Sequence, residues 1–253
     1  MPLQTIGDVI AELNTVIDYC VQHRHRAGFF AALYKRMTVA VSDGITAGVF
    51  EDGKRMEQLD ICFAQRYLDA WRFYGLKQPC TASWQFTFDG CFHQPNTVLQ
   101  HLLLGINTHI NLDLAIAAAQ VAPGSAIDAL EEDFNRINNV IATLVDDVQE
   151  SLSKVWFPMR FIAKIANRRH EPVLNFSIET ARKVSWANAV VLAHQDDNGR
   201  REQVNLMDNT VKQIGQRIQQ PGRWAGFLLW LVRKTEYDDV ARTIKLIDTT
   251  VVP

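Results

Sequence analysis

The sequence predicts an all-α protein, a multi-helix bundle whose helices are joined by short connections. Apolar residues recur three and four positions apart over most of the chain, the spacing that places them on one face of a helix. The 253 residues include only 8 prolines and 13 glycines, which is few for a β-sandwich or a loop-rich fold. Because no internal repeat or Gly/Ser-rich linker interrupts the pattern, we expect a single domain over residues 1–253, with C-terminal helices in 175–248 packed on the rest.

The first part of the chain contains three helical patterns, over residues 5–22, 27–41 and 55–73. The glycine-rich stretch 42–53 is expected to form a loop between the second and third patterns. Pro79 ends the third pattern, because the residue before a proline is disfavoured in the α region. The aromatic segment 81–93 alternates like a strand but has no evident partner, so we favour a helix or an irregular loop.

The second part begins with a helix that Pro95, Asn96 and Thr97 introduce. The predicted helices cover residues 98–119, 125–154, a long region from 175 or 177 that is interrupted near 195–202, and the shorter stretches 226–233 and 237–247. These boundaries follow from the apolar period and from capping residues.

Composition removes several classes of function. A net charge of −2 gives no electrostatic reason to expect a nucleic acid as partner. The four cysteines are widely spaced without a CxxC pair, which disfavours a zinc–thiolate site. The N-terminus does not resemble a signal peptide, and we expect no apolar run of the roughly 18 residues that a membrane span needs. The expected location is cytoplasmic.

The stretch HLLLGINTHINLDL, residues 101–114, places polar side chains within an apolar helix. Positions four apart nearly eclipse on one face, so His101, Gly105, His109 and Asp113 form a ladder. Gly105 leaves room for an ion, a water molecule or a closely packed helix. A second pair, Asn107 and Asn111, lies on another face and is expected to tie this helix to its neighbours.

The ladder predicts either a metal site or a structural hydrogen bond. Imidazole and carboxylate ligands suit Zn, Mn or Fe, so His101, His109 and Asp113 are candidate ligands of a divalent metal. In the structural interpretation, Asp113 instead holds His109 in one tautomer by a hydrogen bond, since a buried polar group without a partner costs about 1–3 kcal/mol.

Other helices supply candidate catalytic residues, because a site in a bundle draws side chains from facing helices. The segment 59–71 contributes Arg66, Tyr67 and Asp69, with Asp60 at its start, and the alternative is a salt-bridged surface. A further candidate face, in 133–149, contains Arg136 followed by side chains at four-residue spacing, namely Asn139, Thr143 and Asp147. Motifs of serine hydrolases, P-loops, dinucleotide-binding loops and HExxH metalloproteases do not occur.

Several segments together resemble a bacterial family classed as domain of unknown function 5995. The segments are YKRMTVAVSDGITAGVFED, LDICFAQRYLDAW, LQHLLLGINTHINLDLAIAAA, DFNRINNVIATLVDDVQ and NFSIETARKVSWANA. The resemblance covers roughly residues 34–189, and HLLLGINxHINLDL is its most specific part. It implies an all-helical bacterial protein without an assigned reaction, and it identifies no functional residues.

Three functions are compatible with these observations. The first is a metal-dependent enzyme, most simply a hydrolase, acting on a small or lipid-like molecule; Asp60 or Asp69 would add a ligand or base, and Arg66 or Arg136 would hold substrate charge. The second is a non-catalytic protein that binds an apolar ligand in an aromatic pocket, formed by Phe63, Tyr67, Trp71, Trp84, Phe88 and Trp186. The third is a structural bundle that forms a homodimer through an apolar face.

Overall fold

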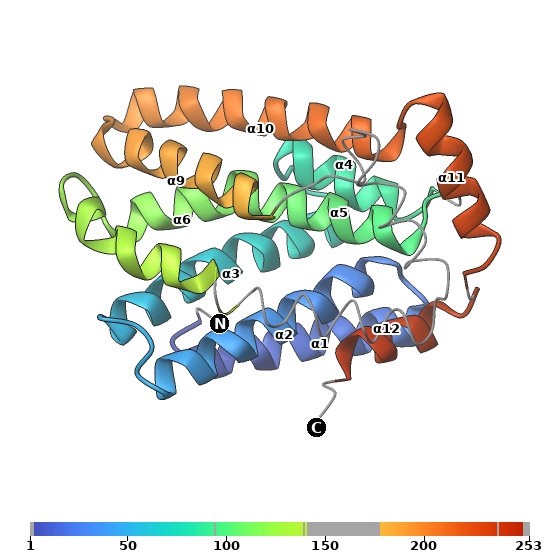
Figure 1. Ribbon diagram of the computed structural model, residues 1–253, viewed down its shortest axis with the longest axis horizontal. Coiled ribbons are helices and arrows are strands. Elements are labelled where there is room, and N and C mark those ends of the chain that lie inside the picture. The colour runs from blue at the N-terminus through green and yellow to red at the C-terminus, as the bar shows by residue number, and fades with distance from the viewer. Residues whose placement is uncertain (1–2, 94, 139, 141–177, 237, 250–253) are drawn as a thin grey trace.

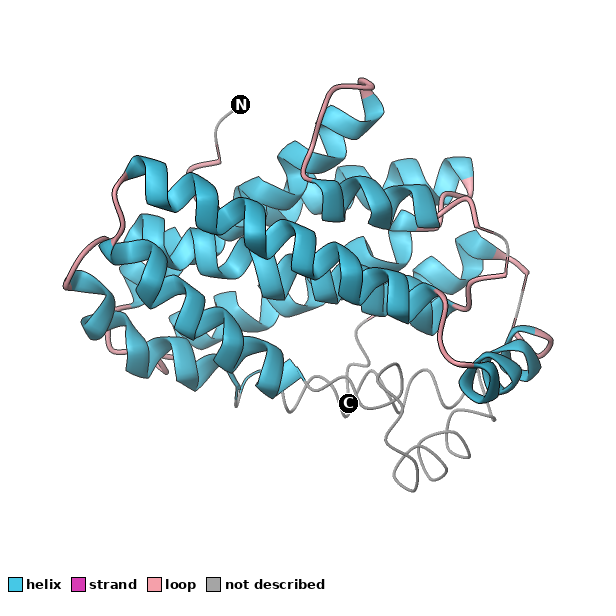
Figure 2. Cartoon of the chain, turned by 90° about the horizontal axis from the view of Figure 1, so that it is seen from above, coloured by secondary structure: helices cyan, strands magenta, loops and turns pink. Residues whose placement is uncertain are grey.

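The computed structural model describes residues 3–93, 95–138, 140, 178–236 and 238–249. Within these residues the chain is helical, with no strand, which confirms the predicted all-α class. Most helices run along the long axis of the molecule, and α11 crosses one end of it (Figures 1 and 2). The residues outside these ranges include Asn139, Thr143, Asp147 and half of the helix predicted over 125–154, which therefore lie outside the described part.

The N-terminal helices are α1 (Ile6–His23), α2 (Ala27–Thr46) and α3 (Gly53–Gly75). A capping box begins α1, because the Thr5 side chain accepts from the Asp8 amide while Asp8 binds back to the Thr5 amide. Helix α2 extends five residues beyond the predicted end at Val41, through Gly44. The Phe50 ring packs directly over Gly44, so tertiary packing holds this turn in spite of glycine's low helix propensity.

The ambiguous aromatic segment forms a helix, α4 (Ala82–Gly90). Trp84 and Phe88 lie one turn apart and are both buried. Residues four apart share one face of a helix, but they also share one face of a strand, so the sequence pattern fits both. The Asp208 carboxylate, from another helix, accepts hydrogen bonds from the Ala82 and Ser83 amides. A neighbouring helix therefore satisfies the first amides of α4 in place of a local cap.

The helix predicted over 98–119 is present but is not uniform. It consists of α5 (Val98–Thr108), a π-helical segment (His109–Asp113) and α6 (Leu114–Val121). A second capping box begins it, formed by Thr97 and Gln100. In the π segment the Leu114 amide binds the His109 carbonyl, five residues earlier, whereas an α-helix uses a spacing of four.

By length and composition alone, the run Val98–Val121 could cross a membrane, so the expectation that no apolar run is long enough was wrong. In the described part of the chain, 78% of its most apolar window is buried inside the bundle. A buried core helix has the same composition as a membrane span, so this run is explained by its central position in the fold.

The remaining helices are residues 126–138, α9 (Ile178–His194), α10 (Asp197–Gln219), α11 (Arg223–Arg233) and α12 (Val240–Asp248). The expected interruption near 195–202 is short, since Asp196 caps α10 and begins it at once. Helices α9, α10 and α4 pack on one side of the central run, and α2 and α3 pack on the other (Figure 1). Helix α12 returns to cover α1 and α2.

Candidate functional site

Asp113 is the centre of a buried hydrogen-bond network. Its side chain is 1% exposed and accepts three hydrogen bonds. Arg66 Nε donates to Oδ1 at 2.9 Å, and Trp84 Nε1 donates to Oδ2 at 2.8 Å. His109 Nδ1 lies 3.0 Å from the same Oδ2. Charge-assisted bonds of this kind are the stronger hydrogen bonds of proteins, so Asp113 is held firmly in one orientation.

Two helices and the π segment bring these groups together. Arg66 comes from α3 and Trp84 from α4, while His109 and Asp113 are the first and last residues of the π segment. Single π turns inside α-helices are frequent at functional sites, because the wider turn redirects side chains. The bonds from α3 and α4 to Asp113 help to stabilise this wider turn.

The network fixes the tautomer of His109. Indole and guanidinium N–H groups can only donate, so both Asp113 oxygens act as acceptors. His109 therefore carries its proton on Nδ1, assigned here from the hydrogen-bond network, and donates it to Asp113. Nε2 is left with an unprotonated lone pair, and this buried atom has no hydrogen-bond partner among the described residues. This part of the structural interpretation made from sequence is confirmed.

Aromatic side chains surround the His109 imidazole. The Phe63 ring stacks on it with centroids 3.6 Å apart, and the Tyr34 ring meets it edge-on at 4.4 Å. Phe30, Tyr67 and Trp84 complete the enclosure at centroid distances of 5.7, 5.9 and 6.0 Å. Burial lowers the pKa of His109, more than the hydrogen bond to Asp113 raises it, so the ring is neutral near pH 7.

Further polar atoms near this histidine are buried without partners. They are the Tyr67 hydroxyl and Asp60 Oδ2, whose charge acts on the Tyr34 phenol, again counting only partners in the described part of the chain. The Tyr34 hydroxyl has the Thr38 hydroxyl beside it. Burial, and secondarily the charge of Glu57, raises the pKa of Asp60 to about 7. Burial also raises the pKa of both phenols, so the two tyrosines are uncharged donors. Buried polar atoms normally have partners, so this group is suited to water or a small polar molecule.

His101 does not join His109 and Asp113. Residues eight apart on an α-helix are about 12 Å apart along its axis, too far to bind one ion with bonds of about 2 Å. The His101 ring lies instead against Phe29, and burial lowers its pKa to about 3. Among the described residues no group of three His, Cys, Asp or Glu side chains is arranged to hold a metal ion. His101, His109 and Asp113 therefore do not converge on one point, and metal binding by this protein stays a prediction.

Gly105 makes room for a closely packed helix, one of the three occupants considered from the sequence. A Cβ atom at this position would lie 2.3 Å from Cγ of Phe30, on α2. One member of the asparagine pair ties this helix to a neighbour, as predicted. Asn107 donates to the Val211 carbonyl of α10 at 2.9 Å, whereas Asn111 donates to Asn107 within the same helical run.

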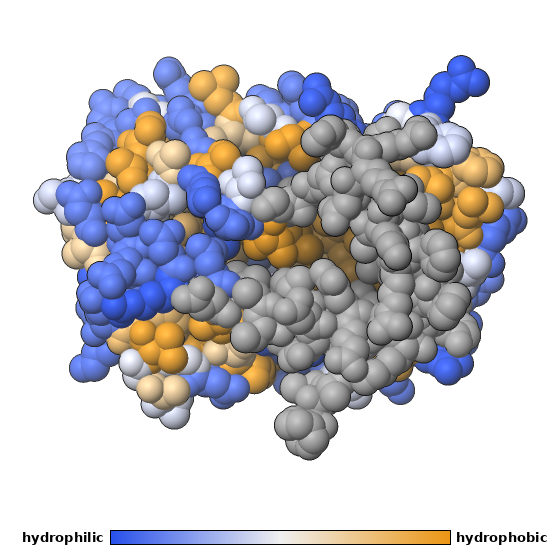
Figure 3. Space-filling view, in the orientation of Figure 1, coloured by the Kyte–Doolittle hydropathy of each residue, from blue (hydrophilic) through white to orange (hydrophobic). Residues whose placement is uncertain are grey.

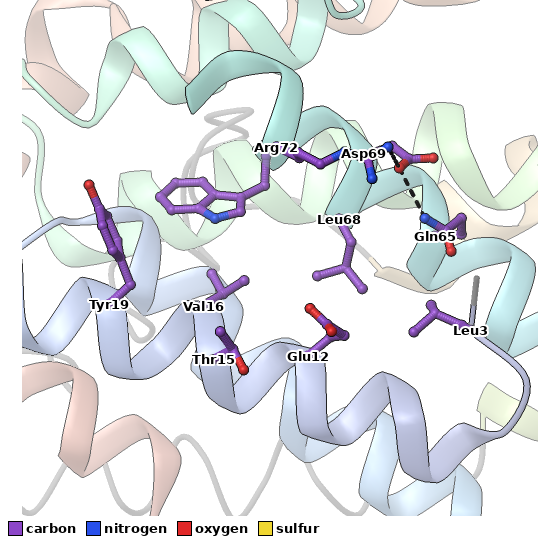
Figure 4. Close-up of a pocket in the computed structure, with 10 residues that line it drawn as sticks. Leu3, Glu12, Thr15, Val16, Tyr19, Gln65, Leu68, Asp69 and Arg72 are labelled. Carbon is purple, nitrogen blue, oxygen red and sulfur yellow. Dashed lines mark hydrogen bonds and ion pairs between the residues drawn. The ribbon is translucent and has the colours of Figure 1, made fainter. Parts of the chain in front are cut away.

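Asp69 and Arg136 lie outside this network. Asp69 lies beside a groove of about 310 Å³ between α1 and α3. Its carboxylate accepts hydrogen bonds from Gln65, as Figure 4 shows, and from Arg72. Arg136 forms ion pairs with Glu51, Glu132 and Asp133, which tie residues 51 and 52 to the helix at 126–138. Of the five predicted catalytic residues, Arg66, Asp60 and Tyr67 are in or near the site.

The aromatic residues predicted to line a pocket mostly fill the core instead. The Tyr67, Trp84 and Phe88 rings contact one another in sequence, at centroid distances of 5.2 and 5.1 Å. Trp71 continues this series from the groove side. Trp186 is separate from it and packs on Phe134. These contacts explain the aromatic content of the chain as core packing.

Sequence reasoning missed Tyr34 and Phe30 as site residues and assigned Trp84 to a pocket instead of a hydrogen bond. A signal was present, since Phe30 and Tyr34 are four residues apart on one helix and Phe63 and Tyr67 repeat that spacing. Helical spacing shows that each pair shares a face. It does not show which other helix that face meets.

Comparison with known proteins gives one match. The model of a family described as "Family of unknown function (DUF5995)" matches residues 6–221. No curated protein matches the chain significantly. No solved structure matches it either.

Proposed function

This chain belongs to the family of unknown function DUF5995, and from the arrangement of its own side chains we propose that it is an enzyme in which His109 acts as a general base. The observation that carries the proposal is the pairing of Asp113 with Nδ1 while Nε2 stays buried and unpartnered within the described residues. An imidazole oriented by a carboxylate, with its second nitrogen free, is the recurring arrangement of acid–base sites.

The neighbouring groups suit this role. Arg66 and Trp84 hold Asp113, and Asp113 in turn holds the ring and stabilises the imidazolium that forms when Nε2 takes up a proton. The proton would come from a water molecule or from a hydroxyl of the bound molecule. The Tyr34 and Tyr67 phenols, uncharged near pH 7, would donate hydrogen bonds to its oxygen atoms.

The site favours a small and uncharged polar substrate. Burial already disfavours charge on His109 and on Asp60, and it would disfavour charge on a ligand for the same reason. Phe63 is only partly buried and stacks on His109, so we expect its ring to cover the entrance to the site. Hydrolysis is compatible with this arrangement, because His109 itself can remove the proton of an attacking water.

Substrate conversion tests the proposal directly. The purified chain and the variant His109→Leu would each be incubated with an extract of small metabolites, and mass spectrometry would follow which compounds decrease. We expect at least one small polar compound to decrease with the wild type and to remain with the variant. The rate should fall by about 100-fold or more when the base is lost.

His101→Leu is the matched control. It removes a buried histidine from the same helix, at a position without a carboxylate partner, so it should keep the activity at comparable stability. Identical profiles for the wild type and His109→Leu, with the variant folded by circular dichroism, would show that the network is only structural and would end the proposal.

A further inference from the structure

Helix α11 exposes a continuous apolar face at one end of the molecule. Four large apolar side chains on it are about half exposed, namely Trp224 (48%), Phe227 (49%), Trp230 (54%) and Leu231 (43%). Figure 3 shows the resulting apolar patch over α11. Their positions follow the helical period, so they point to the same side.

Stacking between neighbouring rings holds the exposed aromatic side chains of α11 in place. The Trp224 and Phe227 rings stack with centroids 6.1 Å apart, and the Phe227 and Trp230 rings repeat this distance. The opposite face of α11 is buried against the bundle by Ala225, Leu229 and Val232. Because the apolar residues on the inner face already pack in the core, rotation of the helix cannot bury the outer ones.

Positive charge flanks the exposed aromatic residues. Arg223 and Lys234 lie on the same exposed side, one at each end, and the Lys234 ammonium lies 5.8 Å from the Trp230 ring centroid. The segment Arg223–Arg233 contains no acidic residue. Of the acidic residues that follow, Asp238 is paired with Arg233 at 3.0 Å. The surface that meets a partner therefore combines aromatic rings with positive charge.

We propose that this face of α11 binds the surface of a membrane that contains anionic lipids. Tryptophan and phenylalanine flanked by basic residues are typical of helices that lie in the membrane interface, where rings enter the headgroup region and cations meet lipid phosphates. A second copy of the chain fits less well. Four half-exposed side chains offer roughly 400 Å², about half of what each partner buries in a standard interface.

Vesicle binding by the full chain tests this proposal. We expect co-sedimentation with vesicles of phosphatidylcholine mixed with phosphatidylserine, weaker binding to phosphatidylcholine alone, and a blue shift of tryptophan emission. The double variant Phe227→Ser/Trp230→Ser should bind at least about tenfold more weakly, because the apolar contribution is lost. Lys234→Glu should lose the preference for phosphatidylserine.

Val184→Ser/Val191→Ser is the matched control, since it removes two other exposed apolar side chains, both on α9, and should bind like the wild type. Failure of the wild type to bind the mixed vesicles at low salt would overturn the proposal, as would unchanged binding by the α11 double variant. A dimer in analytical ultracentrifugation that dissociates in that variant would assign the face to a second copy instead.

Discussion

At the scale of single residues, the position of Asp113 determines the chemistry available to His109. Three donors from three different elements converge on one carboxylate. The carboxylate in turn decides which imidazole nitrogen carries the proton. One side chain thus links the packing of α3 and α4 to the lone pair that we propose as the base.

Asp113→Asn should destabilise the protein by about 3 kcal/mol, because the amide group places N–H donors against existing donors and removes the charge that Arg66 meets. Urea unfolding followed by circular dichroism measures this loss. The control Asp69→Asn alters a more exposed carboxylate and should change the stability by less than about 0.5 kcal/mol. Equal effects of the two substitutions would contradict the central role of Asp113.

Ionisation of the buried Asp60 carboxyl group should make the protein less stable as the pH rises. Its folded pKa of about 7 lies above the reference value of 3.8, so between these values the folded chain binds more protons than the unfolded chain. The free energy of unfolding therefore falls through this window and stays lowered above about pH 7.

Asp60→Asn should remove this dependence. Relative to the wild type, the variant should gain stability at about pH 8, by at most about 4 kcal/mol, and little near pH 4. Urea unfolding of both proteins at the two pH values measures the difference. Glu236, whose pKa burial also raises to about 7, remains in both proteins, so the comparison isolates Asp60. A gain that does not depend on pH would refute this account.

At the scale of helices, the close contact between α2 and α5 depends on Gly105. Phe30 occupies the space where a side chain at this position would lie, and the same ring packs edge-on against His109. The glycine thus lets α2 contribute one wall of the histidine's enclosure.

Gly105→Ala should destabilise the fold by about 1–3 kcal/mol, because Phe30 must leave its place. Thermal unfolding gives the change in stability, and the NMR signals of the His109 ring should shift as Phe30 moves. Gly75→Ala is the control, since nothing lies within 4 Å of a Cβ there and better helix propensity should raise the stability slightly. An unchanged melting temperature for Gly105→Ala would contradict the contact.

Helix positions could largely be predicted from sequence, because the apolar period and the capping residues are local signals. Thr5, Thr97 and Asp196 begin their helices as such residues should. The predicted helix boundaries were wrong where contacts with residues distant in the sequence determine where a helix begins or ends. Phe50 keeps Gly44 helical, and Asp208 supports the start of α4 from a position more than a hundred residues away.

At the scale of the whole molecule, α12 completes the core although it lies beyond the residues that the family model matches. Val240, Ile244 and Ile247 belong to the same apolar cluster as α1 and α2. Ile244 packs where a Cβ atom at Gly28 would lie, 2.5 Å from its Cδ1. The last described helix is thus part of the fold that supports the site.

Ile244→Ala should lower the stability by about 2–5 kcal/mol, because it leaves a cavity between α12 and the first two helices. Urea unfolding measures the loss. Val191→Ala removes an exposed apolar side chain of α9 and should have little effect. If both variants unfold at the same urea concentration, α12 does not stabilise the bundle.

The site could be predicted only in part, because its members come from four elements. The ladder identified His109 and Asp113 and their mutual bond, since both lie on one helix. Arg66 was a candidate, but no local pattern shows that it meets Asp113 forty-seven residues away. His101 shares their face but lies apart from them, because alignment on one face does not bring residues eight apart within reach of each other.

The π segment also has a consequence for the evolution of this protein. A π turn holds one residue more than the α turn that it replaces, so the loss of a single codon between positions 109 and 113 would restore a regular helix. The two halves of that helix would keep the faces they show to the bundle, and only the spacing of the histidine and the carboxylate would change. A descendant with this deletion would keep the fold and lose the site, so the activity that we propose could be gained or lost in one genetic step.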